Sequence, residues 1–345
     1  HAHEMIFGTY GMALAGFLTT AVPEWTDTPR RRDRDLLLLL GLWLPGRIVG
    51  LVGADPLAGL AGVTDAAFLL LLTWFIAKPL IDRRSTRHLS FPIWCGLFAG
   101  VEIAIRVAWL TGAYDWSGRL LEAALAIFLV FFSLSVARIN VVVINLALDP
   151  SGETTPYRPH PGRQNLAAGL VALYVVALLA LPNSLAPAFL ALAAGAAFFD
   201  RLAEWFIGRA VLKAEVLGLF GANLMAGLGF LAVGAAGLGA PLSAHTGLHL
   251  LSMGSLGLAV ISVFIIAGLR HTGRDLVLPP QAHWALGLML LAALVRTLPE
   301  LGIGESLLGF HYGLAALLWA GAFGVWLQGF LPYFAAPTLK STLAS

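Results

Sequence analysis

Charged residues and cysteines are scarce in this sequence of 345 residues. Only 12% of the residues are charged, against about 25% in ordinary soluble domains, and 59% are hydrophobic. So few charges cannot supply the polar surface that a soluble protein of this length needs. The single cysteine, Cys95, excludes an internal disulfide, a CxxC redox pair and a cysteine-ligated iron–sulfur cluster. The net charge of +2 gives no indication of a nucleic-acid partner.

Long apolar runs are what the sequence does contain. Each run is long enough to cross about 30 Å of hydrocarbon as a helix, and none shows the two-residue alternation of a membrane β-barrel. The runs cover residues 4–22, 36–53, 56–80, 91–111, 119–146, 165–181, 187–207, 214–239, 243–269, 281–298 and 307–331. The sequence therefore predicts an all-α polytopic membrane bundle of eleven spans, with the lipid bilayer as its first partner.

Arginine and lysine gather in every second connection between these runs. They lie within residues 30–34, 83–87, 158–163, 209–213 and 270–274, and the intervening loops have essentially none. Because such loops remain cytoplasmic, the first span is expected to begin on the outer side and the C-terminus to lie in the cytoplasm.

The longest polar stretch is the loop 150–164, with four prolines and two glycines. We interpret the chain as one transmembrane domain, 1–345, in which this cytoplasmic loop joins possible halves 1–149 and 165–345. The chain begins at His1 without a signal-peptide pattern, so we expect a segment that precedes it to be missing.

Ionisable residues at membrane depth are costly unless they are paired or ligated, which makes them candidates for function. With the orientation above, ten of them fall in the outer half of the bundle: His1, His3, His245, His249, His311, Arg47, Arg106, Arg296, Glu4 and Glu102. Imidazoles supply axial ligands to haem iron, and the arginine fork suits haem propionates. This set indicates a membrane haem site, in which Glu4 or Glu102 relays protons.

Each of these residues also has a simpler interpretation. His1 and His3 point about 200° apart on a regular helix, so they hardly share one metal. Three interpretations stay open: one binds haem and the other copper, one orients the other, or both lie at the membrane interface. His245 and His249 share a helix face, as two ligands of one site do, although His245 also suits a helix start. Glu102 also suits an ion pair with the arginine four residues later.

Two further histidines are candidates on weaker grounds. His271 lies at the inner end of its span, where it suits a capping loop as well as a separate metal centre. His311 is a lone histidine near a helix start, and its assignment as a ligand depends on depth alone.

Several segments together resemble the NnrS family. They are His1-Ala2-His3-Glu4-Met5 with Phe7-Gly8, the stretch from Ala15 to Thr26, Leu42-Trp43-Leu44-Pro45-Gly46-Arg47, His249 followed by His271-Thr272-Gly273-Arg274, Arg296, and Leu318-Trp319-Ala320-Gly321-Ala322-Phe323. The resemblance implies a bacterial inner-membrane protein of about twelve helices, linked to nitric oxide and denitrification. It implies haem, of b type, and copper as cofactors, and it carries His1, His3, His249 and His271 over as metal-site residues.

The resulting hypothesis is an oxidoreductase that holds nitric oxide at a haem and a nearby copper, with electrons from an external donor. Two other hypotheses stay open. One is a haem-based sensor or scavenger that binds nitric oxide without turnover, and the other is a membrane transporter.

Overall fold

The structure is a computed structural model of the chain and describes residues 1–336. Within these residues, eleven helices are long and apolar enough to cross a membrane, and there is no strand. The predicted all-α bundle of eleven spans is therefore confirmed, and the chain is a multi-pass membrane protein. The C-terminus, which we expect to be cytoplasmic, lies outside the described residues.

Two compact units make up the chain, residues 1–131 and residues 132–345, of which the second is described to residue 336. The division falls within helix α5 (Tyr114–Leu148), whereas the halves considered from the sequence meet at the loop 150–164. That loop is irregular, as its prolines suggest, and the next helix already begins at Pro161.

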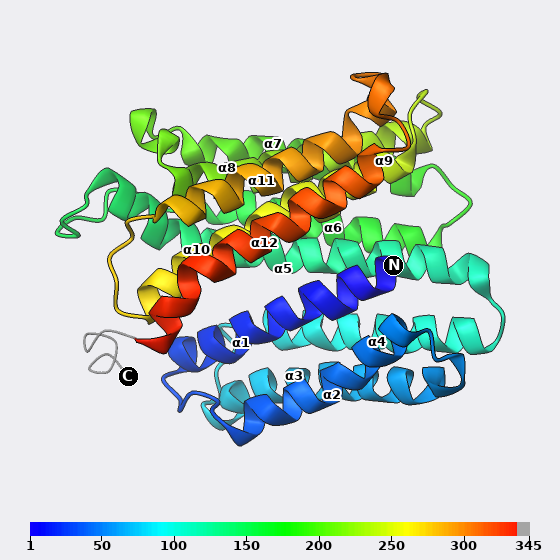
Figure 1. Cartoon of the computed structure of the whole chain (residues 1–345), viewed down its shortest axis with the longest axis horizontal. Helices are drawn as coiled ribbons and strands as arrows, with labels where there is room; N and C mark the ends of the chain where they lie inside the picture. Colours follow the sequence, from blue (N-terminus) through cyan, green and yellow to red (C-terminus); the bar gives the residue numbers. More distant parts are fainter. Residues whose placement is uncertain (337–345) are drawn as a thin grey trace. The chain divides into compact units, whose positions relative to one another are not determined.

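The first unit is organised around helix α3. Its spans are the π-helical turn η1 (Glu4–Tyr10) with α1 (Gly11–Thr26), α2 (Arg34–Val52), α3 (Ala58–Asp82), α4 (Ser90–Leu110) and the first part of α5 (Figure 1). Helix α3 packs against α1, α2 and α4. Helix α2 ends at Gly53, whose φ of 68° is a left-handed conformation that glycine adopts without strain. These contacts bring side chains from three other spans toward α3.

The second unit is organised around helix α8. Its helices are the second part of α5, α6 (Pro161–Ala180), α7 (Ala186–Arg201) with the 3₁₀ turn η3 (Leu202–Trp205), α8 (Ala214–Gly237), α9 (Ala244–His249), η5 (Leu250–Gly257), α10 (Leu258–His271), α11 (Pro280–Thr297) and α12 (His311–Ala335). Helix α8 packs against α7, α9, η5 and α10. A Cβ at Gly195 of α7 would lie 3.0 Å from the carbonyl oxygen of Gly227 of α8, so only glycine lets these two helices approach so closely.

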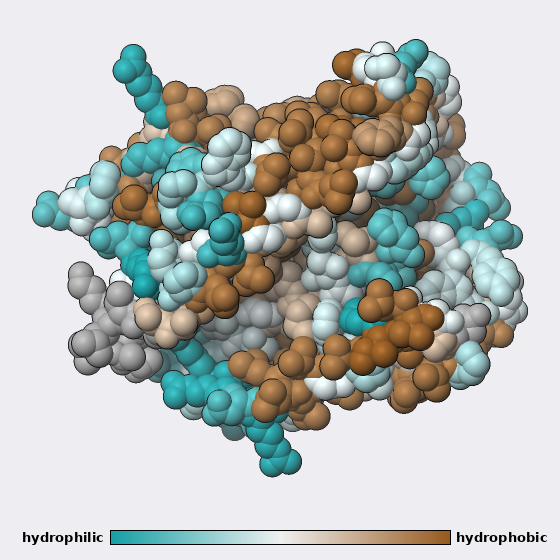
Figure 2. All heavy atoms as spheres, viewed as in Figure 1, coloured by the Kyte–Doolittle hydropathy of each residue, from teal (hydrophilic) through white to brown (hydrophobic). Residues whose placement is uncertain are grey.

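The outer faces of the helices are apolar. Helix α2 buries only Leu39 and Gly46, while side chains such as Leu37, Leu51 and Val52 are exposed. Figure 2 shows apolar atoms over the middle of the helices and hydrophilic atoms mostly at their ends. A soluble protein does not expose so much apolar surface, whereas hydrocarbon covers it without cost.

Two spans contain a π-helical segment, and each segment follows a histidine. Segment η1 begins directly after His3, and η5 begins directly after His249. The π-helix is rare and often occurs at functional sites. Within the described residues, this local geometry marks two of the six histidines that the sequence offers as candidates.

Candidate functional site

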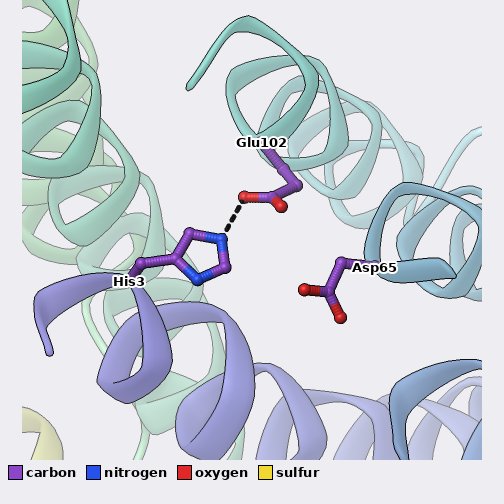
Figure 3. A group of neighbouring side chains, drawn as sticks. All are labelled: His3, Asp65 and Glu102. Atoms are coloured by element: carbon purple, nitrogen blue, oxygen red, sulfur yellow. Dashed lines mark hydrogen bonds and ion pairs between the residues drawn. The ribbon is translucent and has the colours of Figure 1, made fainter. Parts of the chain in front are cut away.

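Buried polar side chains form a cluster inside the first unit. Figure 3 shows its centre: His3 at the start of the first span, Asp65 on α3 and Glu102 on α4. The sequence places the start of the first span and the end of α4 at one level, and the structure brings their side chains into contact. Asp65 was not predicted, although a lone acid within an apolar run is by itself a signal of function.

Short contacts connect the cluster around His3. The Nε2 atom of His3 lies 2.7 Å from Glu102 Oε2, and its Nδ1 atom lies 3.3 Å from Glu4 Oε1. Arg106 donates from Nε to Glu102 Oε1 over 2.7 Å and from Nη2 to Asp65 Oδ2 over 2.7 Å. Glu102 therefore bridges an imidazole and a guanidinium.

Arg47 closes the cluster on the side of α2. It donates from Nη2 to Asp65 Oδ2 over 2.8 Å, and its Nε lies 2.9 Å from Glu4 Oε2. Its Nη1 atom is buried and makes no hydrogen bond. The neighbouring Trp43 indole donates to the carbonyl of Gly8 over 2.9 Å and so ties α2 to the first span.

Negative charges outnumber positive ones in this cluster when the His3 ring is neutral. Glu4, Asp65 and Glu102 carry three negative charges, and Arg47 and Arg106 carry two positive ones. Buried charges must be balanced, and both ring nitrogens of the imidazole face carboxylate oxygens, which only accept. A doubly protonated imidazole satisfies both observations. The cluster thus has the groups of an acid–base site, an imidazole between two carboxylates, with the Arg106 guanidinium 3.1 Å from the same Nε2 atom.

Glycines make room for the charged groups. A Cβ at Gly8 would lie 2.5 Å from Arg47 Nη1, and a Cβ at Gly46 would lie 2.5 Å from Asp65 Oδ1. Both glycines belong to the segments noted in the sequence. Their role is steric, because any side chain there would push apart a buried ion pair.

A metal ion fits this cluster poorly in the arrangement that the structure shows. One ligand atom each from His3, Asp65 and Glu102 lie within 4.8 Å of one another. However, the Arg106 guanidinium already binds both carboxylates. One nitrogen and two oxygens are also not the donors that copper(I) prefers. No step through copper is derived from this group.

The second unit has its own cluster, where the start of α9 meets the end of α11. Arg296 donates from Nη1 to Glu300 Oε1 over 2.5 Å, and the same nitrogen lies 3.3 Å from His311 Nε2. Thr246 donates to the other oxygen of Glu300 over 2.8 Å. The guanidinium also stacks on the ring of Tyr312, 4.3 Å from its centroid. His245 and His249 lie on α9, and Arg296 lies on α11. Because α9 packs against α11, these residues, which were predicted near one level, lie on elements that meet.

His249 is oriented as metal-ligating histidines are. Its Nδ1 atom lies 2.7 Å from the backbone carbonyl of His245. Because a carbonyl only accepts, Nδ1 carries the hydrogen and Nε2 keeps its lone pair. A backbone carbonyl holding the far ring nitrogen is the usual arrangement of a ligand histidine. The side chain is half-buried, and within the described residues Nε2 has no hydrogen-bond partner.

The other predicted histidines lie elsewhere. His271 ends the span that contains His249, 22 residues later (271 − 249), which is about 33 Å along a helix. It therefore does not join the site of His249. His1 and His245 are exposed, and His311 is buried against Arg296. A common level for His3 and His249, which belong to different units, stays a prediction.

Comparison with known proteins gives the family. A search of curated proteins found no match, and neither did a search of solved structures. The family model described as "NnrS protein" matches residues 1–338. Because this match covers almost the whole chain, the resemblance drawn from the sequence is confirmed, and the protein belongs to the NnrS family.

Proposed function

We propose that this protein is a haem-binding protein of the bacterial inner membrane that acts on nitric oxide, with His249 as the residue that would hold the iron. The observation that carries this proposal is the contact of His249 Nδ1 with the His245 carbonyl over 2.7 Å, which orients the ring and leaves Nε2 without a hydrogen bond within the described residues. Membership of the NnrS family supports it independently. When bound, haem iron supplies a site for a diatomic ligand and for the electrons that reduce it.

The chain's own residues supply protons and positive charge. Reduction of nitric oxide consumes protons as well as electrons, and the cluster of the first unit holds one proton at His3 between Glu4 and Glu102. Glu102 is fully buried, so it exchanges a proton only through its partners. We therefore propose that Glu102 relays the proton of His3 and that the partly exposed Glu4 links His3 to water.

The three predicted propionate partners differ in what they have left to offer. Arg106 and Arg296 each form an ion pair with a carboxylate four residues away in the chain, Glu102 and Glu300 respectively. Arg47 has two buried nitrogens without a hydrogen bond, Nη1 and Nε, of which Nε lies 2.9 Å from Glu4 Oε2. Its Nη1 atom is therefore a buried donor that an acceptor within the first unit could use.

Copper as a second cofactor is proposed on the family resemblance. The exposed imidazoles of His1, in the first unit, and of His245, in the second, are candidate donors. The carboxylate-rich group at His3 does not suit copper in this arrangement, and we assign no chemistry to copper here.

A haem and metal inventory tests the cofactor assignment. We expect purified protein to show a haem spectrum, His249→Ala to lose it, and His271→Ala to retain it. The two variants change the same residue type at opposite ends of one span, so a general loss of folding would affect both. Full haem in His249→Ala refutes the assignment, and a protein without haem after expression with haem supply refutes the haem hypothesis and favours a transporter.

Nitric oxide consumption with an artificial electron donor separates an enzyme from a sensor or scavenger. We expect repeated turnover, and we expect Glu102→Gln to lower its rate by about 10²-fold or more, because proton transfer by a positioned group contributes that much. The spectrum of the nitric oxide complex serves as the control, since the variant keeps the haem ligand. Stoichiometric binding without turnover would leave the sensor hypothesis.

A further inference from the structure

Arginines gather at one end of the first unit. The connection between α1 and α2 and the connection between α3 and α4 both lie at this end (Figure 1). Together with the first residue of α2, they contain seven arginines, within residues 30–34 and 83–87. Because loops rich in arginine remain on the cytoplasmic side, we expect this end to face the inner leaflet of the membrane.

Contacts between the two connections hold them side by side. The Arg83 guanidinium donates to the backbone carbonyl of Asp27 and lies 3.8 Å from the carboxylate of the same residue. The ring of Trp25, near the end of α1, packs on the ring of His88 with 5.3 Å between the ring centroids. His88 is buried, so this contact belongs to the packed interior. The two sets of arginines therefore form one surface, which we call the arginine patch.

Most side chains of the arginine patch have no partner. Nearby acids are already paired, since Asp35 lies 3.1 Å from Arg31 and Asp82 lies 2.7 Å from Lys78. Within the described residues, five exposed arginines make no ion pair or side-chain hydrogen bond: Arg30, Arg32, Arg34, Arg84 and Arg87. The acids without a partner beside them are Glu24 and Asp33. Positive charge is therefore in excess on this surface.

Arg84 occupies a position where glycine is the usual residue. It follows the end of α3, and its φ of 49° lies in the left-handed region. Its N–H donates to the carbonyl of Ile81, and the N–H of Ser85 donates to the carbonyl of Leu80. This pair of hydrogen bonds is the Schellman motif, in which the left-handed residue is most often glycine.

Three other helices of this chain end in the same motif with glycine. The same pair of hydrogen bonds follows α4, α8 and α10, where the left-handed residues are Gly112, Gly239 and Gly273. A side chain in the left-handed conformation is destabilising relative to glycine. The stability of the turn therefore does not explain an arginine at position 84. Its exposed charge requires a different explanation, which a ligand outside the chain supplies.

Exposed apolar side chains begin directly beside the arginine patch. Leu37 of α2 is 67% exposed, and Ile81 of α3 is 61% exposed. Helices α2 and α3 pack against each other, so both side chains belong to the lipid-facing surface of one unit. A ligand with a negative headgroup and hydrocarbon chains contacts both kinds of surface at once. Free phosphate contacts only the arginines.

We propose that the arginine patch binds the phosphate group of an anionic phospholipid, with Arg84 in direct contact and the acyl chains along α2 and α3. Guanidinium groups bind phosphate oxygens through charge-assisted, often bidentate hydrogen bonds. Clusters of about four to eight basic residues beside a membrane span are typical of binding to anionic lipids. This inference goes beyond the function proposed above and does not depend on it.

Native mass spectrometry of the full chain in neutral detergent tests the proposal. Phosphatidylglycerol and the zwitterionic phosphatidylcholine are titrated separately, and the dissociation constant of the first bound lipid is measured. We expect phosphatidylglycerol to bind more tightly. We expect Arg84→Gly to weaken its binding by about fivefold, which corresponds to about 1 kcal/mol for one arginine near the membrane surface. Equal affinities of the parent protein for the two lipids overturn the proposal.

The variant Arg84→Gly separates binding from folding, because glycine fits the left-handed turn at least as well as arginine. We expect it to unfold at the same denaturant concentration as the parent or at a higher one. Arg119→Gln is the control. Arg119 lies near the start of α5, at the other end of this unit, and stacks on Trp116. This variant removes the same charge and should keep the parent's affinity.

Two results overturn the assignment of the site, namely unchanged affinity in Arg84→Gly and an equal loss in Arg119→Gln. Inorganic phosphate at constant ionic strength tests the nature of the ligand. We expect it to leave phosphatidylglycerol bound, because it cannot replace the contacts of the acyl chains. Displacement of the lipid by phosphate overturns a phospholipid as the occupant. Since these measurements need no cofactor, their failure is distinct from failure of the nitric oxide hypothesis.

Discussion

Asp65 offers the sharpest test of the first cluster, because one of its oxygens accepts from two guanidiniums. Asp65 Oδ2 lies 2.8 Å from Arg47 Nη2 and 2.7 Å from Arg106 Nη2, and the side chain is only 4% exposed. Removing one partner of a buried ion pair costs about 3–5 kcal/mol, since the remaining charge stays buried. We expect Asp65→Asn to lower the free energy of unfolding by that amount.

Asp82 supplies a matched control on the same helix. It pairs with Lys78 over 2.7 Å, but its side chain is 54% exposed. Exposed pairs four residues apart contribute about 0.3–0.5 kcal/mol, so Asp82→Asn should have almost no effect. Unfolding in mixed micelles, followed by tryptophan fluorescence, measures both variants. Equal and small losses in the two would refute the conclusion that Asp65 balances the buried arginines.

Two further predictions concern packing and the loop. Gly8→Ala should lower the unfolding free energy by about 1–3 kcal/mol, because its methyl group meets a guanidinium; Gly16→Ala, on the same span with open space around it, should not. Hydrogen bonds from Ser151 and Thr154 lower the pKa of Asp149 to about 2. The stabilisation of this loop is therefore present above the ordinary aspartate pKa and is lost as the pH falls through about 2. Amide hydrogen exchange at Thr154 should rise there, and Asp149→Asn should show the faster exchange at neutral pH; a variant that exchanges like the parent contradicts the assignment.

The expected depth of each residue along its span predicted several members of the candidate site. The alternating direction of the spans places the first residues of the first span and the last residues of the second and the fourth at one end. His3, Arg47 and Glu102 meet in this way in the first unit. Asp65 was not predicted, although a lone acid in an apolar run is as strong a signal of function as a histidine or an arginine there.

The sequence did not predict the buried contacts that Arg201 makes with Glu204 and Ser133, or the hydrogen bond from Asn140 to Glu204. Ser133 and Arg201 are 68 residues apart in sequence, and Asn140 lies within a helix whose apolar residues dominate the pattern. Glu204 itself falls at the end of a span, where a charged residue is unremarkable. Only the packing of α5 and the end of α7 brings these groups together.

The sequence by itself determined the number of spans and their helical nature, because length and hydrophobicity are local properties that lipid selects directly. It also determined the family, through segments spread along the chain. The tertiary structure decided which carboxylate balances which arginine, that the ring of His3 lies between two carboxylates, and that Nε2 of His249 keeps its lone pair. These features depend on how each helix is rotated and how closely it packs. Rotation and packing are set by side chains of helices that are distant in the chain, so no local pattern encodes them.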